Sequence, residues 1–393
     1  MRKLEKDVKS IVTSPYLRQE QKVEALNTFI WPTLVYPLQT APIHKISVTI
    51  LEDLDKLIRS AVKEVLDIPS DIPNSMLYSP KKYRGLEIFR ASWEAYIKHY
   101  SICEKLERCG NQIVIECRKV KEEKNFCLEK LKIIPTVNDK NILNTKNIRE
   151  HLRHREFEEW CKLPSKGKGV ILFSEHIKSN RWFHSRDGIN MSEYKEMLKM
   201  TGGVTAIKSV PGRSGSGNQC RRCSSTEKFQ IETLPHILGS CPFGESLRNT
   251  RHHTVRSLIA NNLKESGFEV YEEIVCLADD KTNRRVDILA IDQKRRKAYI
   301  IDPTIRFETD ETQPESVNLE KKSIYDPTTN YFKTNYKLQD IEVIGLMFGA
   351  RGAIPKFTQN CWTALKLKQS VLKNIWTVCI KNSVSLLRQH IYS

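Results

Sequence analysis

Four potential metal ligands lie within 22 residues, in the spacing C-x2-C-x12-H-x4-C: Cys220, Cys223, His236 and Cys241. Three thiolates and one imidazole suit a tetrahedral zinc ion, and because the set leaves no open coordination position, we expect the zinc to be structural. Ligation would replace the hydrophobic core that so short a segment cannot build. The other cysteines lack such spacing and are expected to be buried thiols; a chance cluster is the alternative for the four.

Two aspartates are expected to lie on neighbouring strands of a β-hairpin. Two apolar, β-prone runs are separated by six polar residues, 292–297, which is typical of a hairpin loop. If Ile291 pairs with Ala298, then Asp287 opposes Asp302 on one face of the sheet. Two such carboxylates repel each other unless a cation lies between them, and oxygen ligands suit Mg²⁺ or Mn²⁺. The alternative is two exposed turn residues that never meet, and a slip of one residue in register would separate the pair.

A helix expected at residues 316–325 supplies a basic and a phenolic side chain. Lys321 and Tyr325 are four residues apart and therefore share one helical face. A phosphodiesterase needs positive charge at the scissile phosphate and a group that orients water, and Lys321 supported by Tyr325 fits these roles. Lys322 is the alternative for the basic role, and a solvated lysine pair is the simpler interpretation.

Further polar residues flank this expected site. Arg251 and His252 begin the helix that precedes the strands, and both are candidate nucleic-acid contacts. His252 is equally compatible with metal binding or with a place in the core or at the surface. Glu272 and Glu273 could add an acidic group at the edge of the site.

The elements that must position these residues fall into two halves. Apolar residues at three- and four-residue spacing predict helices at 19–29, 53–66 and 91–106. The first should end at Trp31-Pro32, because proline cannot donate to the helix ladder. Residues 103–168 are strongly charged, which indicates a solvated helix face or a linker that contacts nucleic acid.

A small-residue joint at 213–218 precedes a change in character. After it, the sequence predicts a helix around 255–263 and then mixed strands and helices, with a helical tail at about 362–390. Strands with flanking helices indicate an α/β or α+β unit at 250–350. The expected strands lie at 268–277, 285–291, 298–305 and 341–348.

The composition limits the partners. The chain has 393 residues, a length that predicts two to four domains. Its net charge is +17 and its pI is near 9.3, which indicates a polyanionic partner such as nucleic acid. No apolar run approaches the length of a membrane span, and the charged N-terminus lacks the apolar core of a secretory signal. We therefore expect a reducing compartment, in which the cysteines stay thiols or bind metal.

Taken in order, these motifs resemble the C-terminal part of non-LTR retrotransposon Pol polyproteins, in the clade that inserts into ribosomal RNA genes. The resemblance covers nearly the whole chain, and its one notable departure is Val286, where the family often has proline. Three motifs lie in the N-terminal part: Leu17-Arg18, Tyr36-Pro37-Leu38-Gln39 and Asp53-Leu54-Asp55. Two lie at the expected zinc site: Cys220-x2-Cys223 and Thr233-Leu234-Pro235-His236-Ile237-Leu238-Gly239-Ser240-Cys241. The others follow it: Arg251-His252, Arg285-Val286-Asp287-x14-Asp302, Glu320-Lys321-x3-Tyr325 and Gly349-Ala350-Arg351-Gly352.

The resemblance implies a multidomain fold: an all-α N-terminal half, a CCHC zinc knuckle and an α/β restriction-like endonuclease of the PD-(D/E)XK type. Asp287, Asp302 and Lys321 would take the two acidic positions and the lysine position of that nuclease. The implied parts are a reverse-transcriptase thumb-like domain at 1–105, a basic helical linker at 106–212, the knuckle at 213–250, the endonuclease at 251–355 and a helical tail at 356–393.

The same resemblance implies a function in target-primed reverse transcription. The nuclease would nick target DNA with Mg²⁺ or Mn²⁺, and the new 3′ end would prime synthesis. Target DNA and element RNA would be the partners, the location would be the nucleus, and self-association on DNA stays open; no small-molecule substrate or membrane is implied. The only Asp-Asp pair, Asp279-Asp280, is not in a Tyr-x-Asp-Asp motif, so we expect the polymerase core to be absent from this chain, as in a truncated copy or partial gene.

Two other functions are compatible with the sequence. One is a catalytically dead, zinc-containing nucleic-acid-binding remnant of such an element. The other is a cellular zinc-dependent interaction protein, which would lack the salt-dependent DNA affinity that phosphate contacts produce.

Overall fold

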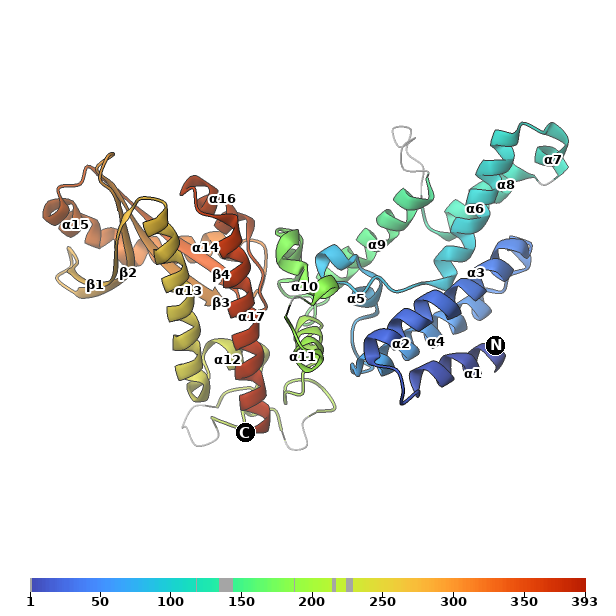
Figure 1. Cartoon of the computed structure of the whole chain (residues 1–393), viewed down its shortest axis with the longest axis horizontal. Helices are drawn as coiled ribbons and strands as arrows, with labels where there is room; N and C mark the ends of the chain where they lie inside the picture. The colour runs from blue at the N-terminus through green and yellow to red at the C-terminus, as the bar shows by residue number, and fades with distance from the viewer. Residues whose placement is uncertain (1, 118, 134–143, 187, 214–216, 224–228) are drawn as a thin grey trace. The chain divides into compact units, whose positions relative to one another are not determined.

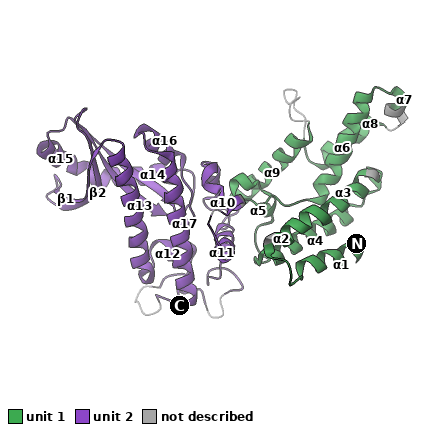
Figure 2. Cartoon of the chain, viewed as in Figure 1, with its two compact units in different colours: residues 1–162 green, residues 163–393 purple. Residues whose placement is uncertain are grey.

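The computed structural model describes residues 2–117, 119–133, 144–186, 188–213, 217–223 and 229–393. The chain divides into two compact units, residues 1–162 and 163–393 (Figure 2). Unit 1 is helical throughout its described residues, whereas unit 2 combines helices with one sheet. The described part of the chain is therefore mostly helical, with a four-stranded mixed sheet in its second half (Figure 1).

Unit 1 packs its amphipathic helices around one apolar core, as their periodicity predicts. Largely buried residues such as Leu54, Ile58 and Tyr100 lie in this core. The helices predicted at 53–66 and 91–106 are confirmed, each somewhat longer than expected. The α-helices of the unit are α1 (Arg2–Val12), α2 (Gln19–Ala25), α3 (Trp31–Thr40), α4 (Val48–Leu66), α5 (Asn74–Tyr78), α6 (Ala91–Cys109), α7 (Gln112–Cys117), α8 (Val120–Lys130) and α9 (Thr145–Cys161).

The predicted helix end at Trp31-Pro32 is wrong. The chain passes from α2 through a π-helical turn, η1 (Leu26–Ile30), directly into α3, which begins at Trp31. Pro32 lies in the first turn of α3, where a backbone N–H has no partner within the helix, so the missing donor does no harm. The π-turn absorbs the change of helical register that lets the chain continue.

Several charged residues between 103 and 162 bind partners within unit 1. Arg149 donates to both carboxylate oxygens of Glu94, at 2.6 and 2.7 Å. Arg155 donates to the carbonyl oxygens of Leu131 and Lys132 at 3.0 and 3.3 Å. For these two arginines the structure favours a packing role over a contact with nucleic acid. Residues 134–143 and Arg118 of the predicted linker lie outside the described residues.

The four predicted strands of unit 2 are confirmed as β1 (Glu269–Leu277), β2 (Asn283–Asp292), β3 (Lys297–Arg306) and β4 (Asp340–Gly349). They lie in the order β1-β2-β3-β4; the first two pairs are antiparallel, and β3 and β4 are parallel. A parallel pair needs a crossover, and it contains α14 (Gln313–Tyr325), the turn η7 (Asp326–Thr328) and α15 (Thr329–Tyr336). The predicted helix at 316–325 is thus confirmed within α14.

Two long helices support the sheet. They are α13 (Glu245–Glu265), which contacts β1, β2 and β3, and α17 (Gln369–Tyr392), which runs along α13 (Figure 1). Both match predicted helical segments. The other helices of the unit are α10 (Trp182–Ser185), α11 (Met191–Thr201), α12 (Leu234–Gly239) and α16 (Lys356–Ala364), with 3-10 turns at Val170–Ser174, Ile177–Asn180 and Pro242–Gly244.

The boundary between the two units does not coincide with the joint expected at 213–218. Residues 214–216 of that joint lie outside the described residues. The boundary falls at residue 162, and residues 163–213 belong to unit 2. A buried ion pair explains part of this. Arg351 binds Glu308 at 3.0 Å and also donates to the carbonyl oxygen of Lys168 at 2.6 Å. The finer division into five parts stays a prediction. No helix among the described residues is long and apolar enough to cross a membrane.

Candidate functional site

The four predicted zinc ligands meet in a buried cluster. Their donor atoms lie within 4.8 Å of one another: Cys220 and Cys223 come from a short turn, His236 from α12, and Cys241 follows that helix. The Cys220–Cys241 and Cys223–Cys241 sulfur distances are 4.0 and 3.7 Å, and Nε2 of His236 lies 3.4 Å from Cys223 Sγ. A tetrahedral zinc site has edges of about 3.8 Å between sulfurs and about 3.6 Å between sulfur and nitrogen. The cluster therefore fits a structural zinc ion.

Burial shifts the protonation equilibria of the ligands. Burial and the neighbouring thiols raise the pKa of the Cys223 thiol to about 12, so a positive charge is needed to hold it as a thiolate near neutral pH. Burial lowers the pKa of His236, which favours the neutral imidazole that binds metal. Its Nδ1 faces the Ser240 hydroxyl at 3.3 Å, which orients Nε2 towards the sulfurs.

Two residues beside this cluster were missed by the sequence reasoning. His390, near the end of α17, lies 3.7 Å from Cys220 Sγ through Nε2 and 3.8 Å from Cys241 Sγ through Nδ1. Glu232 lies 3.3 Å from His390 Nε2 and is completely buried. His390 is separated from Cys220 by 170 positions, so no local spacing could indicate it.

The predicted hairpin register is confirmed. Ile291 pairs with Ala298, and the ladder continues to Ile288 with Ile301. Asp287 and Asp302 are the next residues along the two strands, just beyond the last paired position. Asp302 is buried, and Asp287 is 16% exposed in its side chain, so the two carboxylates differ in their access to solvent.

Two helices bring the other predicted residues to this pair. Lys321 of α14 contacts Asp302, with Nζ at 2.9 Å from Oδ2. The Tyr325 hydroxyl hydrogen-bonds with Asp302 and lies 3.3 Å from the carbonyl oxygen of Arg285. From α13, Nε2 of His252 lies 3.3 Å from Asp287 Oδ2. The structure thus selects Lys321 over Lys322 as the lysine that contacts the acids.

The electrostatics of the acidic site follow from this packing. Burial, and then the charge of Asp287, raise the pKa of Asp302, while Lys321 and the hydrogen bond from Tyr325 oppose the rise. Burial, followed by the charges of Asp302 and Asp287, raises the pKa of Tyr325, which keeps the phenol neutral. The site therefore combines two carboxylates that influence each other, one ammonium group and one neutral donor.

An irregularity in β1 and β2 changes how Asp287 is presented. Tyr271 pairs with Leu289 and Ile274 with Val286, yet all four lie in one hydrophobic cluster. Residues three apart on regular strands face opposite sides, so the alternation is inverted between the two pairs. Between the two pairs lies Glu273, whose φ of 55° is left-handed, and Asp287 is the residue of β2 at the same point of the ladder. The irregularity therefore lies beside the residue that His252 of α13 contacts.

Not every candidate joins the site. Arg251 is buried: its guanidinium donates to Ser383 Oγ at 2.7 Å and to the Leu238 carbonyl oxygen at 3.0 Å. It therefore packs α13 against its neighbours, and its expected contact with nucleic acid stays a prediction. Glu272 and Glu273 bind Arg256 at 3.3 and 2.5 Å, so both acids already have a cationic partner.

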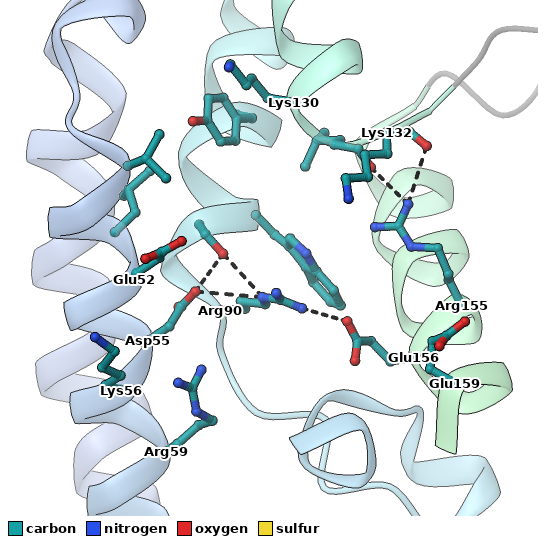
Figure 3. A pocket seen from close by; sticks show the side chains of 16 residues that line it. Glu52, Asp55, Lys56, Arg59, Arg90, Lys130, Lys132, Arg155, Glu156 and Glu159 are labelled. Atoms are coloured by element: carbon teal, nitrogen blue, oxygen red, sulfur yellow. Dashed lines mark hydrogen bonds and ion pairs between the residues drawn. The ribbon is translucent and has the colours of Figure 1, made fainter. Parts of the chain in front are cut away.

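Unit 1 holds a cavity of about 750 Å³ to which the sequence assigned no chemistry (Figure 3). Asp55 in its wall accepts from the Ser92 hydroxyl at 2.5 Å and lies 3.7 Å from Nε of Arg90. Arg90 also donates to Glu156 at 2.6 Å, and its guanidinium lies 4.6 Å from the ring of Trp93. These charges are mutually paired, and the lining carries both signs.

Comparison with known proteins finds distant similarity to retrotransposon Pol polyproteins. No family model matches the chain. It is 21% identical over 388 residues to the Retrovirus-related Pol polyprotein from type-1 retrotransposable element R2 of Popillia japonica, a match that covers 96% of this chain and 75% of that protein. It is 24% identical over 293 residues to the Pol polyprotein from type-2 retrotransposable element R2DM of Drosophila melanogaster.

The chain is a distant homologue of the R2 Pol polyproteins. The Drosophila match covers 72% of this chain but only 25% of the relative, and a second Popillia japonica R2 polyprotein matches 68% of this chain and 34% of its own length. The R2 relationship confirms the resemblance to non-LTR retrotransposon Pol polyproteins, while the assignment to their C-terminal part stays a prediction. Which activities of an R2 polyprotein this chain carries is a separate question.

Proposed function

We propose that unit 2 is a metal-dependent DNA endonuclease that nicks target DNA, so that the new 3′ end can prime reverse transcription. The observation that carries the proposal is that Lys321 and Tyr325 of α14 contact Asp302 of β3, with Asp287 of β2 near enough for its charge to raise the pKa of Asp302. Paired carboxylates beside a lysine supply the charges that phosphodiester hydrolysis requires. The R2 relationship and the net charge of +17 support a nucleic-acid substrate.

Asp287 and Asp302 are the residues that would hold a divalent cation. Their oxygens are hard ligands, and Mg²⁺ commonly binds one or two carboxylates together with substrate phosphate and water. When bound, Mg²⁺ or Mn²⁺ would polarise the scissile phosphate and lower the pKa of water. Among the described residues, the groups of three or more close metal-binding side chains all lie at the knuckle, so a cation at the acid pair would depend on DNA for further ligands.

The chain's own groups have distinct roles in the proposed reaction. Water attacks phosphorus, the bond from phosphorus to the 3′ oxygen breaks, and the 3′ oxygen leaves with a proton. Lys321 would neutralise charge on the phosphate, since its Nζ already lies in the acidic site. Tyr325, held neutral, would fix Asp302 by its hydrogen bond. His252 would fix Asp287 from α13.

The test is a plasmid-nicking assay with Asp287→Asn, in Mg²⁺, in Mn²⁺ and in a chelator. We expect nicking to fall by at least about 100-fold, because one carboxylate of the pair is removed, while DNA binding stays nearly intact. Asp292→Asn is the matched control: it lies on the same strand, but at the hairpin loop beside Arg295. Equal nicking by Asp287→Asn and the unmodified chain would remove the proposed site.

The alternative function is a zinc-containing nucleic-acid-binding protein without catalysis. It predicts DNA affinity that falls steeply with salt, but no nicking by the unmodified chain in either metal. A protein-interaction module predicts neither nicking nor salt-dependent DNA affinity. The proposed roles of element RNA, of a thumb-like unit 1 and of a nuclear location rest on the R2 relationship and need separate binding and localisation experiments.

A further inference from the structure

The C-terminal helix ends against the zinc cluster. His390, in the last turn of α17, is completely buried, and its two ring nitrogens face different thiols. Nε2 lies 3.7 Å from Cys220 Sγ, and Nδ1 lies 3.8 Å from Cys241 Sγ. His236 approaches the cluster from Cys223 instead. One imidazole therefore spans the Cys220–Cys241 edge in addition to the four predicted ligands.

The imidazole is fixed by a second buried group. Glu232 faces His390 Nε2 at 3.3 Å and is itself completely buried. Its carboxylate accepts the backbone N–H of Arg221 at 2.9 Å and that of Lys208 at 2.9 Å, and the Arg221 guanidinium binds it at 2.8 Å. These contacts lower the pKa of Glu232 to about 2, against the effect of its burial. Cys220, Glu232 and His390 also lie close enough to one another to hold a metal ion, but donors already occupy the carboxylate, which favours a role in orienting His390.

The two residues between Cys220 and Cys223 hold the end of the same helix. Arg222 donates to the carbonyl oxygens of His390 and Gln389 at 3.1 and 3.3 Å. Arg221 donates to the carbonyl oxygen of Ile391 at 3.1 Å. The last carbonyls of a helix lack partners within it and carry partial negative charge, so both arginines cap α17. The turn that carries two zinc ligands therefore also binds the C-terminal end of α17.

We propose that the zinc centre is the docking site for the chain's own C-terminal helix, with His390 as the positioning residue on Cys220 and Cys241. A zinc ion with three thiolates and one neutral imidazole has a net charge of −1, and N–H groups near the sulfurs stabilise such a centre. The same ion fixes the turn that carries Arg221 and Arg222. Zinc binding and docking of α17 therefore stabilise each other. This holds whether or not unit 2 cleaves DNA.

Contacts of α17 with α13 connect the zinc centre to the acidic site. Ser383 of α17 accepts a hydrogen bond from Arg251 of α13 at 2.7 Å, and both groups are buried. His252, the next residue of α13, contacts Asp287. A helix held at its end by the zinc centre thus supports the helix that reaches the acidic site.

The test compares His390→Phe with Gln389→Ala in the full chain. Phenylalanine keeps a ring of similar size and the edge contact with Phe243, whose ring centroid lies 6.0 Å from that of His390, but it removes both ring nitrogens. Loss of such an outer contact weakens metal affinity by about 10–100-fold. We therefore expect a chelator-competition assay to show zinc affinity about 10–100-fold weaker in His390→Phe than in the unmodified chain. His390→Gln, which retains an N–H donor, should recover part of it. Gln389 is exposed, so Gln389→Ala should change zinc affinity less than about twofold.

Two further measurements separate this role from direct ligation and from simple packing. With cobalt in place of zinc, His390→Phe should keep the absorption bands of three sulfurs and one nitrogen, whereas His236→Ala should lose them. In hydrogen exchange, removal of zinc should accelerate exchange of residues 380–392 in the unmodified chain. Unchanged zinc affinity in His390→Phe, zinc-independent protection of 380–392, or altered cobalt bands in His390→Phe would each overturn the proposal.

Discussion

The Glu308–Arg351 pair allows a quantitative prediction about what holds unit 2 together. The two side chains are 0% and 3% exposed, and the N–O distance is 3.0 Å. Glu308 also accepts the backbone N–H groups of Arg351 and Ala353, at 3.0 and 3.3 Å. Removal of one partner of a buried pair leaves an uncompensated charge, which costs about 3–5 kcal/mol. We therefore expect Glu308→Ala to lower the free energy of unfolding of unit 2 by about that amount.

The matched control is Glu320→Ala. Glu320 binds Arg306 at 2.7 Å, closer than the buried pair, but the two side chains are 46% and 43% exposed. An exposed pair contributes about 0–1 kcal/mol, so burial and not distance should decide the outcome. Hydrogen exchange of β3 and β4 amides in increasing urea measures unit 2 without assuming that both units unfold together. Equal destabilisation by the two variants, or no coupling in a double-mutant cycle of Glu308→Ala with Arg351→Met, would refute the reasoning.

Three further predictions concern the two sites. Lys321→Met should reduce nicking by about 100-fold or more, whereas Lys322→Met should change it little, because only Lys321 contacts Asp302; plasmid nicking measures both. The raised pKa of Asp302 means that the folded state binds this proton more tightly than the unfolded state, so its contribution to stability falls as pH rises from the ordinary value of 3.8 through the folded pKa. Asp302→Asn should therefore remove this pH dependence, measured by urea unfolding at a series of pH values, and should abolish nicking at neutral pH. Cys241→Ser should reduce zinc content from one ion per chain towards none by elemental analysis, while Cys276→Ser, a buried cysteine of β1, should retain it.

The sequence predicted the features that local patterns determine. The hairpin register followed from the two apolar runs, because a slip of one residue would turn every side chain to the other face. The zinc ligands followed from their spacing, since chelation by a short segment restricts the distances between ligands. The faces of Lys321 and Tyr325 followed from helical geometry. In each case the information lies within a few dozen residues.

The features that were missed depend on contacts between distant segments. Nothing near Arg351 indicates that it donates to Lys168, so the assignment of residues 163–213 to unit 2 was not predictable from composition. The burial of Arg251 likewise depends on distant partners, because its bonds to Ser383 and Leu238 hold it in the interior. From sequence alone, a charged side chain is predicted to be exposed, because most charged side chains are. A buried arginine is identified only by its partners in the folded structure.

The left-handed residue in β1, Glu273, changes the side-chain alternation beside the acidic site, and the sequence does not predict this change. Regular alternation of side chains through Asp287 would place it on the face of Leu289. The alternation is instead inverted next to Glu273, so Ile274 and Val286 share a cluster with Leu289. A left-handed glutamate costs free energy that nearby contacts must offset, and Arg256 binds its carboxylate at 2.5 Å. If this kink presents Asp287 to His252, then Glu273→Gly should preserve nicking, because glycine adopts positive φ freely, whereas Glu273→Val should reduce it. Equal nicking by the two variants would show that Asp287 does not depend on the kink.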